Sequence, residues 1–326
     1  MSTPPTPPTP PGAAAGTVLS LNEDPAAVLE AATWAMAAMV GTLHDALTTP
    51  LAEVLAADPH RTAVLEQAGL VRREGDALVP HPSLVPPDGP TARSAVEARL
   101  SSLRQAVAAA AGETSGGWAA LDDRVLLNQG RASAAVGRAL GSRIVPQLPG
   151  LGDRLAGDGG RILDVGTGVA ALALALAEAF PRAQVTGIDV LERALDLARG
   201  ELAGAPQETA SRVTLLLRDV ADTSEQTAYD LVWLPAPFLS EAVLDTALPR
   251  LTDALVPGGW LVAGAGSPAP DGLRGAVGRW NAARNGGSAY DADQMAAVLT
   301  AQGLEDVRRF PTVPGGPVLV AGRRPQ

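Results

Sequence analysis

The apolar positions after residue 160 alternate between short continuous runs and longer stretches with helical spacing. The short runs are typical of buried strands, and a helical stretch follows each of the first four. Strands that alternate with helices predict a parallel sheet joined by right-handed crossovers. The predicted strands span residues 161–165, 184–189, 212–217, 230–234 and 260–265.

The end of the chain departs from this alternation. Asp291 is a helix N-cap with Gln294 three residues later, and the helix is predicted to end at Gly303. Strands at 306–310 and 317–321 then flank a Pro-Gly-Gly turn, which predicts a hairpin. The last strand of the sheet is therefore expected to run antiparallel to the others.

The N-terminal half has a mainly helical pattern. Two Ala-rich helices are expected within residues 24–57, and a further helix follows at 61–68. Strands at 70–73 and 77–80 flank a Gly-Asp turn. Helix, turn, helix and a two-stranded wing is the order of a winged helix.

Proline and glycine clusters mark the predicted domain boundaries. A Thr-Pro repeat opens the chain and reads as a disordered leader, while an amphipathic helix at 91–111 and further helical pieces lead to a Pro- and Gly-rich cluster at 146–160. We therefore predict a disordered tail at 1–16, a helical, winged-helix-like domain at 17–150, and an α/β domain at 151–326.

Composition narrows the range of partners. The 326 residues carry a formal charge of −10, and all 25 basic residues are Arg. Such an acidic chain lacks the charge needed to neutralise phosphates or to bind anionic lipid, so we expect neither a nucleic-acid nor a membrane partner. We expect no membrane span, because no apolar run reaches the roughly 18 to 20 residues that a span requires. A cytoplasmic location is expected.

The same composition affects how the winged-helix pattern is interpreted. Its candidate recognition helix offers Arg61, Glu66 and Gln67 among Ala, Val and Leu, which suits a protein partner better than a phosphate backbone. The chain has no Cys, so disulfides and thiolate metal sites are excluded, and we expect no metal.

The first predicted strand runs directly into a glycine turn. Gly166, Thr167 and Gly168 lie where a ligand can approach the backbone closely, at the carboxyl edge of the sheet. Asp164 precedes the turn; a carboxylate there would repel a pyrophosphate but can accept a hydrogen bond from an amino group. Asp189 ends the second strand, where it can accept hydrogen bonds from both hydroxyls of a ribose.

Asp219 follows the third predicted strand. It can accept a hydrogen bond from the exocyclic amine of adenine, and the backbone after it shapes a purine slot. Together the three carboxylates describe an adenosine ligand that carries an ammonium group and no phosphate. This indicates S-adenosylmethionine (SAM).

With these motifs, residues 150–326 resemble a class I SAM-dependent methyltransferase. The resemblance extends to 229–232 at the fourth strand, to 255–261 before the fifth and to the reversed hairpin, although Ala170 stands where the family usually has a third glycine. It implies an α/β fold with a Rossmann-like seven-stranded sheet, SAM as cofactor and S-adenosylhomocysteine as product. The expected cofactor-binding residues are Asp164, Gly166, Thr167, Gly168, Asp189, Val190, Asp219, Val220, Leu234 and Arg131.

The N-terminal half extends the resemblance to small-molecule O-methyltransferases of plant and bacterial secondary metabolism. The winged-helix-like module, the linker helix and the segment 127–133 have the layout of that family. There the module dimerises and walls the acceptor pocket, and the segment before the first strand closes over the methionine end. The resemblance implies a homodimer, with Arg131 and Gln129 as candidate lid or cofactor contacts; a surface Arg and Gln on a helix is an equally open interpretation.

The resemblance breaks down at the general base. Plant-like members place a His just after strand four, where residues 233–241 of this chain contain none. A base could come from His44, His60 or His81, or from the carboxylate Glu241. Otherwise the acceptor needs no strong base, which would suit a nitrogen, an electron-rich carbon or an acidic phenol.

Aromatic and proline residues follow the fourth strand. Trp233, Pro235 and Phe238 are expected to form an apolar wall for the acceptor. Trp280 and Asn281, between the fifth strand and the last crossover helix, are candidate capping residues, although Trp280 could equally serve packing alone.

These observations predict a SAM-dependent methyltransferase that acts on a small, aromatic acceptor of secondary metabolism, with O-methylation favoured. One alternative is N- or C-methylation of a heteroaromatic molecule without a His base. The alternatives from another class are a SAM-sensing winged-helix regulator and a silent partner subunit.

Overall fold

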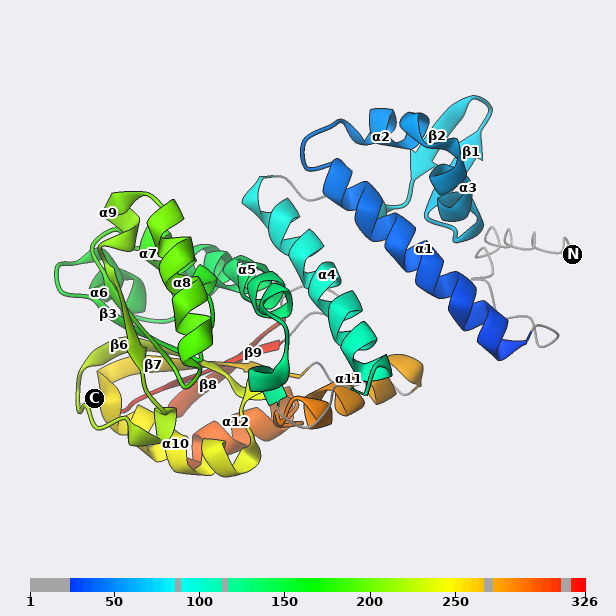
Figure 1. Cartoon of the computed structure of the whole chain (residues 1–326). Helices are drawn as coiled ribbons and strands as arrows, with labels where there is room; N and C mark the ends of the chain where they lie inside the picture. Colours follow the sequence, from blue (N-terminus) through cyan, green and yellow to red (C-terminus); the bar gives the residue numbers. More distant parts are fainter. Residues whose placement is uncertain (1–23, 86–88, 113–116, 267–271, 312–317) are drawn as a thin grey trace, which may run out of the picture. The chain divides into compact units, whose positions relative to one another are not determined.

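The computed structural model describes residues 24–85, 89–112, 117–266, 272–311 and 318–326 (Figure 1). Its contacts divide the chain into two compact units, Met1–Pro86 and Pro87–Gln326. The tail predicted at residues 1–16 lies outside the described residues.

The N-terminal unit contains the predicted helices and the two-stranded wing. Asp24 caps the first helix through a bond from the Ala26 backbone N–H, and Pro25 occupies its first position. The strands pair antiparallel, as a hairpin requires. The elements are α1 (Pro25–Asp45), α2 (Leu51–Ala57), α3 (Pro59–Gln67), β1 (Val71–Glu74), β2 (Ala77–Pro80) and η1 (Pro82–Leu84).

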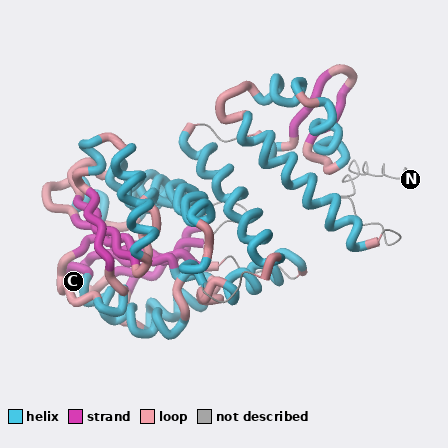
Figure 2. Tube along the Cα trace, viewed as in Figure 1, coloured by secondary structure: helices cyan, strands magenta, loops and turns pink. Residues whose placement is uncertain are grey.

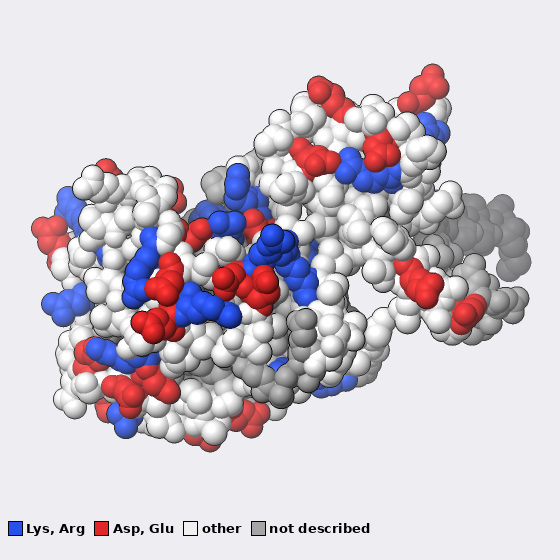
Figure 3. All heavy atoms as spheres, in the orientation of Figure 1, with Lys and Arg blue, Asp and Glu red and all other residues white. Residues whose placement is uncertain are grey.

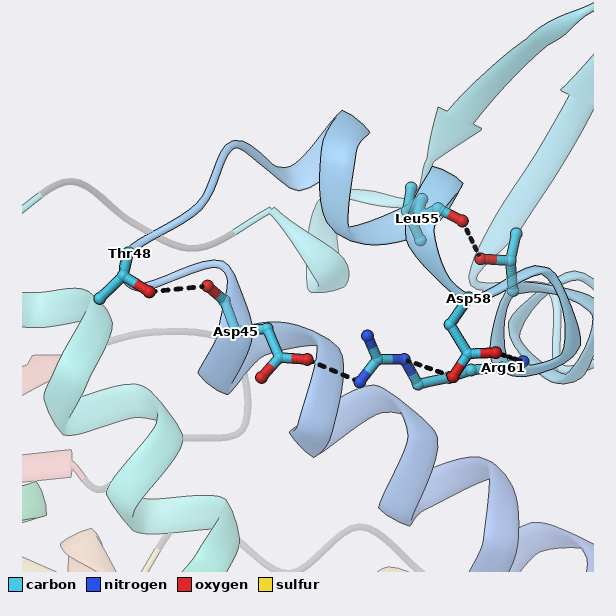
Figure 4. A network of polar contacts seen from close by, with 6 residues as sticks. Asp45, Thr48, Leu55, Asp58 and Arg61 are labelled. Carbon is cyan, nitrogen blue, oxygen red and sulfur yellow. Dashed lines mark hydrogen bonds and ion pairs between the residues drawn. The ribbon is translucent and has the colours of Figure 1, made fainter.

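Polar contacts at the start of α3 join the three helices of this unit (Figure 4). The Arg61 guanidinium pairs with Asp45 at the end of α1 at 2.7 Å, and the Arg61 backbone N–H donates to the Asp58 side chain. The buried Thr62 hydroxyl donates to the carbonyl of Leu55 in α2 at 2.6 Å. The arginine of the candidate recognition helix is thus engaged within its own unit.

Helix α1 corrects one expectation from the sequence. It is 21 residues long with a mean hydropathy of 1.5, which by length and composition suffices to cross a membrane. Its apolar character comes from many alanines with scattered Leu, Val and Met, so the sequence shows no single strongly hydrophobic run here. Because such a helix also occurs in soluble proteins and in signal sequences, it is weak evidence for a membrane span.

A seven-stranded sheet forms the centre of the second unit (Figure 2). The strand order is β5-β4-β3-β6-β7-β9-β8, and β9 runs antiparallel to both of its neighbours, as predicted. The strands are β3 (Arg161–Val165), β4 (Gln184–Asp189), β5 (Val213–Leu217), β6 (Tyr229–Pro235), β7 (Leu255–Ala265), β8 (Glu305–Pro311) and β9 (Val318–Arg323).

Helices cover both faces of this sheet (Figure 1). On one face Ile162 of β3 packs with Leu172 and Leu176 of α7, while its neighbour Leu163 packs on the other face with Leu244 of α10. Both faces are buried, which explains the continuous apolar runs of the strands. The helices are α4 (Pro90–Ala110), α5 (Asp123–Ala139), α6 (Leu151–Ala156), α7 (Ala171–Ala179), α8 (Glu192–Gly204), α9 (Gln207–Ala210), α10 (Glu241–Ala254), α11 (Leu273–Arg284) and α12 (Ala292–Ala301).

Short helical turns complete this unit. The capping box predicted for α12 is present, because Asp291 accepts from the Gln294 backbone N–H and the Gln294 side chain accepts from the Asp291 N–H. The turns are η2 (Gly117–Ala120), the π-helical η3 (Leu140–Ile144), η4 (Val145–Gln147), η5 (Val220–Asp222) and η6 (Ala236–Phe238).

Glycines let α5 approach α7 at short range. A Cβ atom at Gly130 would lie 2.2 Å from Cγ2 of Val169, and one at Gly137 would lie 2.8 Å from the Cβ of Ala175. The same holds at Gly141, further along the same segment. The first part of α5 is thereby held next to the turn that precedes α7.

This contact explains why the units divide elsewhere than predicted. The sequence pattern predicts a boundary at residue 150, whereas the compact units divide between Pro86 and Pro87. Helices α4 and α5 pack on each other, and α5 packs on α7, so both belong to the unit that contains the sheet.

We expect Gly137→Ala to lower the free energy of unfolding by about 1 to 2 kcal/mol, because overpacking against α7 outweighs the gain in helix propensity. Gly200→Ala, in α8 with no atom within 4 Å of the added Cβ, is the matched control and should be neutral or stabilising. Urea unfolding monitored by circular dichroism measures both. Equal stability of the two variants would contradict the close contact.

Candidate active site

The turn between β3 and α7 crosses over the end of β4. The Thr167 backbone N–H donates to the carbonyl of Ile188 at 3.0 Å, and a Cβ at Gly187 would lie 2.6 Å from the Thr167 hydroxyl. Gly166 and Gly168 have φ angles of +61° and +55°, which glycine adopts at little cost. The turn therefore exposes backbone at the carboxyl edge of the sheet.

Ala170 occupies the position where a third glycine was expected. Its φ of +62° lies in the left-handed region, and its side chain is fully buried. Left-handed backbone costs an L-residue roughly 1 to 2 kcal/mol, so the surrounding packing must hold it there.

Asp189 connects the turn to the end of β4. Its Oδ2 accepts from the Gly168 backbone N–H at 2.8 Å, and its Oδ1 accepts from the Leu191 N–H at 2.9 Å. Burial raises the pKa of Asp189, and these two hydrogen bonds offset part of that rise. Each oxygen keeps a lone pair for a ligand hydroxyl.

Asp164 lies beneath the turn and is almost completely buried. Its Oδ2 accepts a hydrogen bond from the Thr167 hydroxyl at 2.7 Å. Burial raises the pKa of Asp164 to about 7, the Thr167 bond opposes the rise, and the nearby Asp189 adds to it. A cationic ligand near the turn would favour the ionised form.

A cavity of about 880 Å³, part of it open to solvent, lies along this edge. One end is formed by β4, the start of α8 and the segment after β5. The residues of this end are Ile188, Asp189, Val190, Leu191, Ala194, Arg218 and Val220. Its mainly apolar surface with a single carboxylate suits an adenosine group.

The other end of the cavity is aromatic. The rings of Trp118 and Phe238 meet edge to face with their centroids 5.0 Å apart. The segment that contains Phe238 is held from behind, since the buried Ser288 hydroxyl donates to the Ala236 carbonyl at 2.8 Å. A Cβ at Gly287 would lie 1.8 Å from the Pro237 carbonyl oxygen, so only glycine fits there.

Nine residues that the sequence pointed to line this one cavity. They come from α5, the glycine turn, the ends of β4 and β6, and the segments after β5 and β6. They are Gln129, Gly166, Thr167, Gly168, Asp189, Val190, Val220, Pro235 and Phe238.

The remaining cofactor candidates lie elsewhere. Asp164 is beneath the turn, and Leu234 is in the core on the α10 face of the sheet. Asp219 accepts from the Ala221 backbone N–H and so caps η5. Arg131 is not among the lining residues, and its guanidinium pairs with Glu201 at 2.7 Å.

The other acceptor and base candidates are likewise outside the cavity lining. Trp233 packs in the core, with Gly264 leaving room for its ring. Trp280 is 59% exposed on α11, and its neighbour Asn281 accepts from the Asn285 amide. Glu241 is exposed at the start of α10.

His44, the second base candidate, belongs to the N-terminal unit. All three histidines of the chain precede residue 82 and lie in that unit. Among the described residues no group of three His, Cys, Asp or Glu could hold a metal ion.

Several lining residues were not assigned to the site from the sequence. They come from η2 and α5, which the sequence placed in a separate domain, and from the edges of the SAM motifs. They are Trp118, Leu126, Gly130, Ser133, Val165, Ile188, Leu191, Ala194, Arg218 and Leu239. The one available signal was the spacing of Gly130, Gly137 and Gly141, which indicates close helix packing but not its partner.

The chemistry of this site can be compared with that of known proteins. Residues 163–261, from β3 into β7, match the family described as "Methyltransferase domain". This stretch is therefore similar to a methyltransferase domain, and the fold is that of the class I SAM-dependent methyltransferases.

Curated relatives match only part of the chain. It is 35% identical over 112 residues to the release factor glutamine methyltransferase of Rhodopirellula baltica, which covers 34% of this chain and 35% of the relative. The chain thus spans about a third of the length of the curated relatives it matches.

Solved structures match over nearly the whole chain. An O-methyltransferase family protein from Burkholderia thailandensis has a TM-score of 0.60 at 17% identity, covering 92% of this chain and 97% of that one. Human N-acetylserotonin methyltransferase, solved with SAM, has a TM-score of 0.61 at 16% identity and covers 94% of this chain and 100% of that one. At such identities the likeness shows the fold alone.

The residues of the cavity fit SAM. The glycine turn leaves room for a ligand against the backbone, and Asp189 offers lone pairs beside an apolar slot. Asp164 is buried beneath the turn, and its ionised form would attract the ammonium and sulfonium charges of SAM bound there.

The raised pKa of Asp164 predicts a pH-dependent stability. The unfolded carboxyl titrates near 4, so between about pH 4 and 7 the folded protein binds more protons than the unfolded chain, and stability falls as pH rises. Asp164→Asn should flatten the decline, by at most about 1.4 kcal/mol per pH unit. Denaturant unfolding at pH 5 and 8 measures this, with the exposed Asp196→Asn as control. Identical pH slopes for wild type and Asp164→Asn would show that Asp164 does not titrate as proposed.

Proposed function

We propose that this protein is a SAM-dependent methyltransferase that acts on a small aromatic acceptor, with O-methylation favoured. The observation that carries the proposal is one cavity with a carboxylate and glycine turn at one end and the Trp118–Phe238 pair at the other. The first end suits adenosine, and the second suits a flat apolar ring. The names of the structural relatives, O-methyltransferases among them, support the same activity.

SAM, when bound, supplies a methyl group on a positively charged sulfur. The residues of the chain then have three tasks: to hold the adenosine, to align the acceptor and to exclude water. Asp189 would accept bonds from the ribose hydroxyls, and the turn would follow the methionine portion closely. Trp118, Pro235 and Phe238 would exclude water from the acceptor end.

A second acceptor chemistry deserves a test, because no imidazole is found among the described residues that line the cavity. A neutral nitrogen of a heteroaromatic ring attacks without prior deprotonation, so N-methylation fits the same site. A panel of hydroxylated and nitrogen-containing aromatics, assayed with isotopically labelled SAM, distinguishes O-methylation from N-methylation by the acceptor atom that receives the labelled methyl group. SAM binding without turnover across the panel would instead favour a silent partner subunit.

The regulator alternative requires DNA binding by the N-terminal unit. All three arginines between residues 24 and 85 form ion pairs: Arg61 with Asp45, Arg72 with Glu74 and Arg73 with Glu66. On the visible face of the molecule arginines and acids are interspersed (Figure 3). These features favour an enzyme without a nucleic-acid partner, and a cytoplasmic location fits the proposed small-molecule acceptor.

The N-terminal unit also supports a proposed homodimer. Helices α1 and α3 line an apolar groove, and Trp34 beside it is 75% exposed while Leu29 is 59% exposed. Apolar surface of this kind is costly in water and is typical of protein interfaces. A second copy of the chain is the occupant that we propose.

We expect Asp189→Ala to raise the Kd for SAM by a factor of about 30 to 1,000. The variant loses charge-assisted hydrogen bonds to two ribose hydroxyls, which together contribute roughly 2 to 4 kcal/mol to binding. Isothermal titration calorimetry measures the Kd, and Asp196→Ala on the surface of α8 is the control. An unchanged Kd would place the cofactor elsewhere. No SAM binding by wild type at millimolar ligand would overturn the proposed function.

For the dimer, Trp34→Glu should convert the wild-type dimer into a monomer, because a carboxylate cannot be buried unpaired in an apolar interface. Light scattering after size-exclusion chromatography gives the mass. Leu217→Glu, at an exposed apolar position of the second unit, is the matched control and should remain dimeric. A wild-type monomer, or a Trp34→Glu dimer, would refute this interface.

A further inference from the structure

Gln129 lines the cavity, and its amide oxygen is already engaged. The hydroxyl of Ser101 in α4, which is fully buried, donates to Oε1 of Gln129 at 3.0 Å. A hydroxyl has a single proton, so Ser101 can donate to one partner only.

A chain of buried amides continues behind this hydrogen bond. The Ser101 oxygen accepts from Nε2 of Gln105 at 2.9 Å, and Oε1 of Gln105 accepts from Nδ2 of Asn285 at 3.1 Å. The same Asn285 nitrogen donates to Oδ1 of Asn281 at 3.2 Å, so both of its protons are used. Gln105 and Asn285 are almost completely buried, where an unmade hydrogen bond is costly.

The consequence is a donor that faces the cavity. With its oxygen turned toward Ser101, Gln129 presents its N–H groups to a ligand, and among the described residues none accepts from them. An amide whose orientation is set from behind cannot turn its oxygen to the ligand without breaking the chain.

Gln129 shares its cavity with the aromatic pair, since Trp118, Gln129 and Phe238 are all lining residues. One helical turn before it on α5, Leu126 packs with Trp118 and with Val169 of the glycine turn. The donor therefore lies in the part of the cavity that borders both the turn and Trp118.

The titratable groups of the lining are otherwise committed. Asp189 accepts two backbone N–H bonds, and Arg218 pairs with Glu225. Among the described lining residues no other side chain is titratable. A hydroxyl acceptor that reaches the site already ionised would need no base from these residues.

We propose, on the basis of the proposed function, that Gln129 donates a hydrogen bond to an oxygen of the acceptor and that this acceptor is an acidic phenol or enol bound as its anion. An N–H donor binds an oxyanion more tightly than the neutral hydroxyl, because the bond to the anion is charge-assisted. The amide thus selects acceptors that ionise near neutral pH. An enzyme with a general base could instead deprotonate ordinary phenols.

The reaction balances without a protein base. The anionic oxygen forms a bond to the methyl carbon while the methyl–sulfur bond breaks, and the electron pair of that bond stays on sulfur. An anion and a cation give two neutral products, the methyl ether and S-adenosylhomocysteine, and no proton is transferred in the step.

The test uses 4-nitrophenol, whose phenolate absorbs in the visible whereas the neutral phenol does not. Bound to the full-length protein saturated with S-adenosylhomocysteine, its apparent pKa should fall below the value in free solution. Gln129→Leu should weaken phenolate binding about tenfold, the effect of one charge-assisted hydrogen bond, and return the bound pKa toward the free value.

Two further variants separate direct contact from structural effects. Gln129→Glu can still accept from Ser101 but replaces the donor with a like charge, so it should raise the bound pKa above the free value. Gln207→Leu, on the exposed surface of α9, should change nothing. Because Gln129→Leu leaves Ser101 without an acceptor, circular dichroism must first show that the variant is folded. If it is not folded, the bound pKa in Gln129→Glu alone tests the proposal.

The Kd for SAM distinguishes this inference from the proposed function. Gln129→Leu and Gln129→Glu should bind SAM as wild type does. If they lose SAM affinity instead, Gln129 serves the methionine carboxylate and the inference is overturned while the function stands. Failure of the saturated wild-type protein to bind 4-nitrophenolate, or an unshifted pKa of the bound phenol, also overturns it.

Discussion

The site depends on the short contact that holds the turn after β3 against the end of β4. The Thr167 N–H bond to Ile188 and the Gly168 N–H bond to Asp189 join two strand ends through the backbone of one turn. Gly187 makes the crossing possible, because any side chain there would occupy the position of the Thr167 hydroxyl. Without this crossing the Asp189 carboxylate and the exposed glycine backbone would not face one cavity.

The same crossing explains why this part of the site could be predicted. A glycine turn directly after a buried strand, with a carboxylate at the end of the next strand, has few three-dimensional solutions in a parallel sheet. Strand positions followed from continuous apolar runs, because both faces of the sheet are covered. Gly166, Gly168 and Asp189 consequently lie together as the pattern indicated.

The acceptor end was harder to predict, because it depends on which helix packs against which. Periodicity places Gly130 and Gln129 on a helix but does not show that this helix packs against α4 and α7. The sequence pattern therefore predicts a domain boundary at residue 150, beyond this helix, and not at Pro86. Alternation along β6 likewise sends Trp233 and Leu234 to opposite faces of a covered sheet, into the core on both sides. Trp118 follows a Gly-Gly pair with no periodic signal at all.

The antiparallel strand β9 has a consequence for the order of assembly. Among the described strands β8 pairs with β9 alone, and β9 in turn pairs with β7, so β8 joins the sheet through β9. During synthesis, residues 305–311 therefore leave the ribosome before this partner strand exists. Strands β3, β4 and β6, whose ends border the cavity, can pair earlier, so the edge that bears the candidate site can form before the sheet is complete.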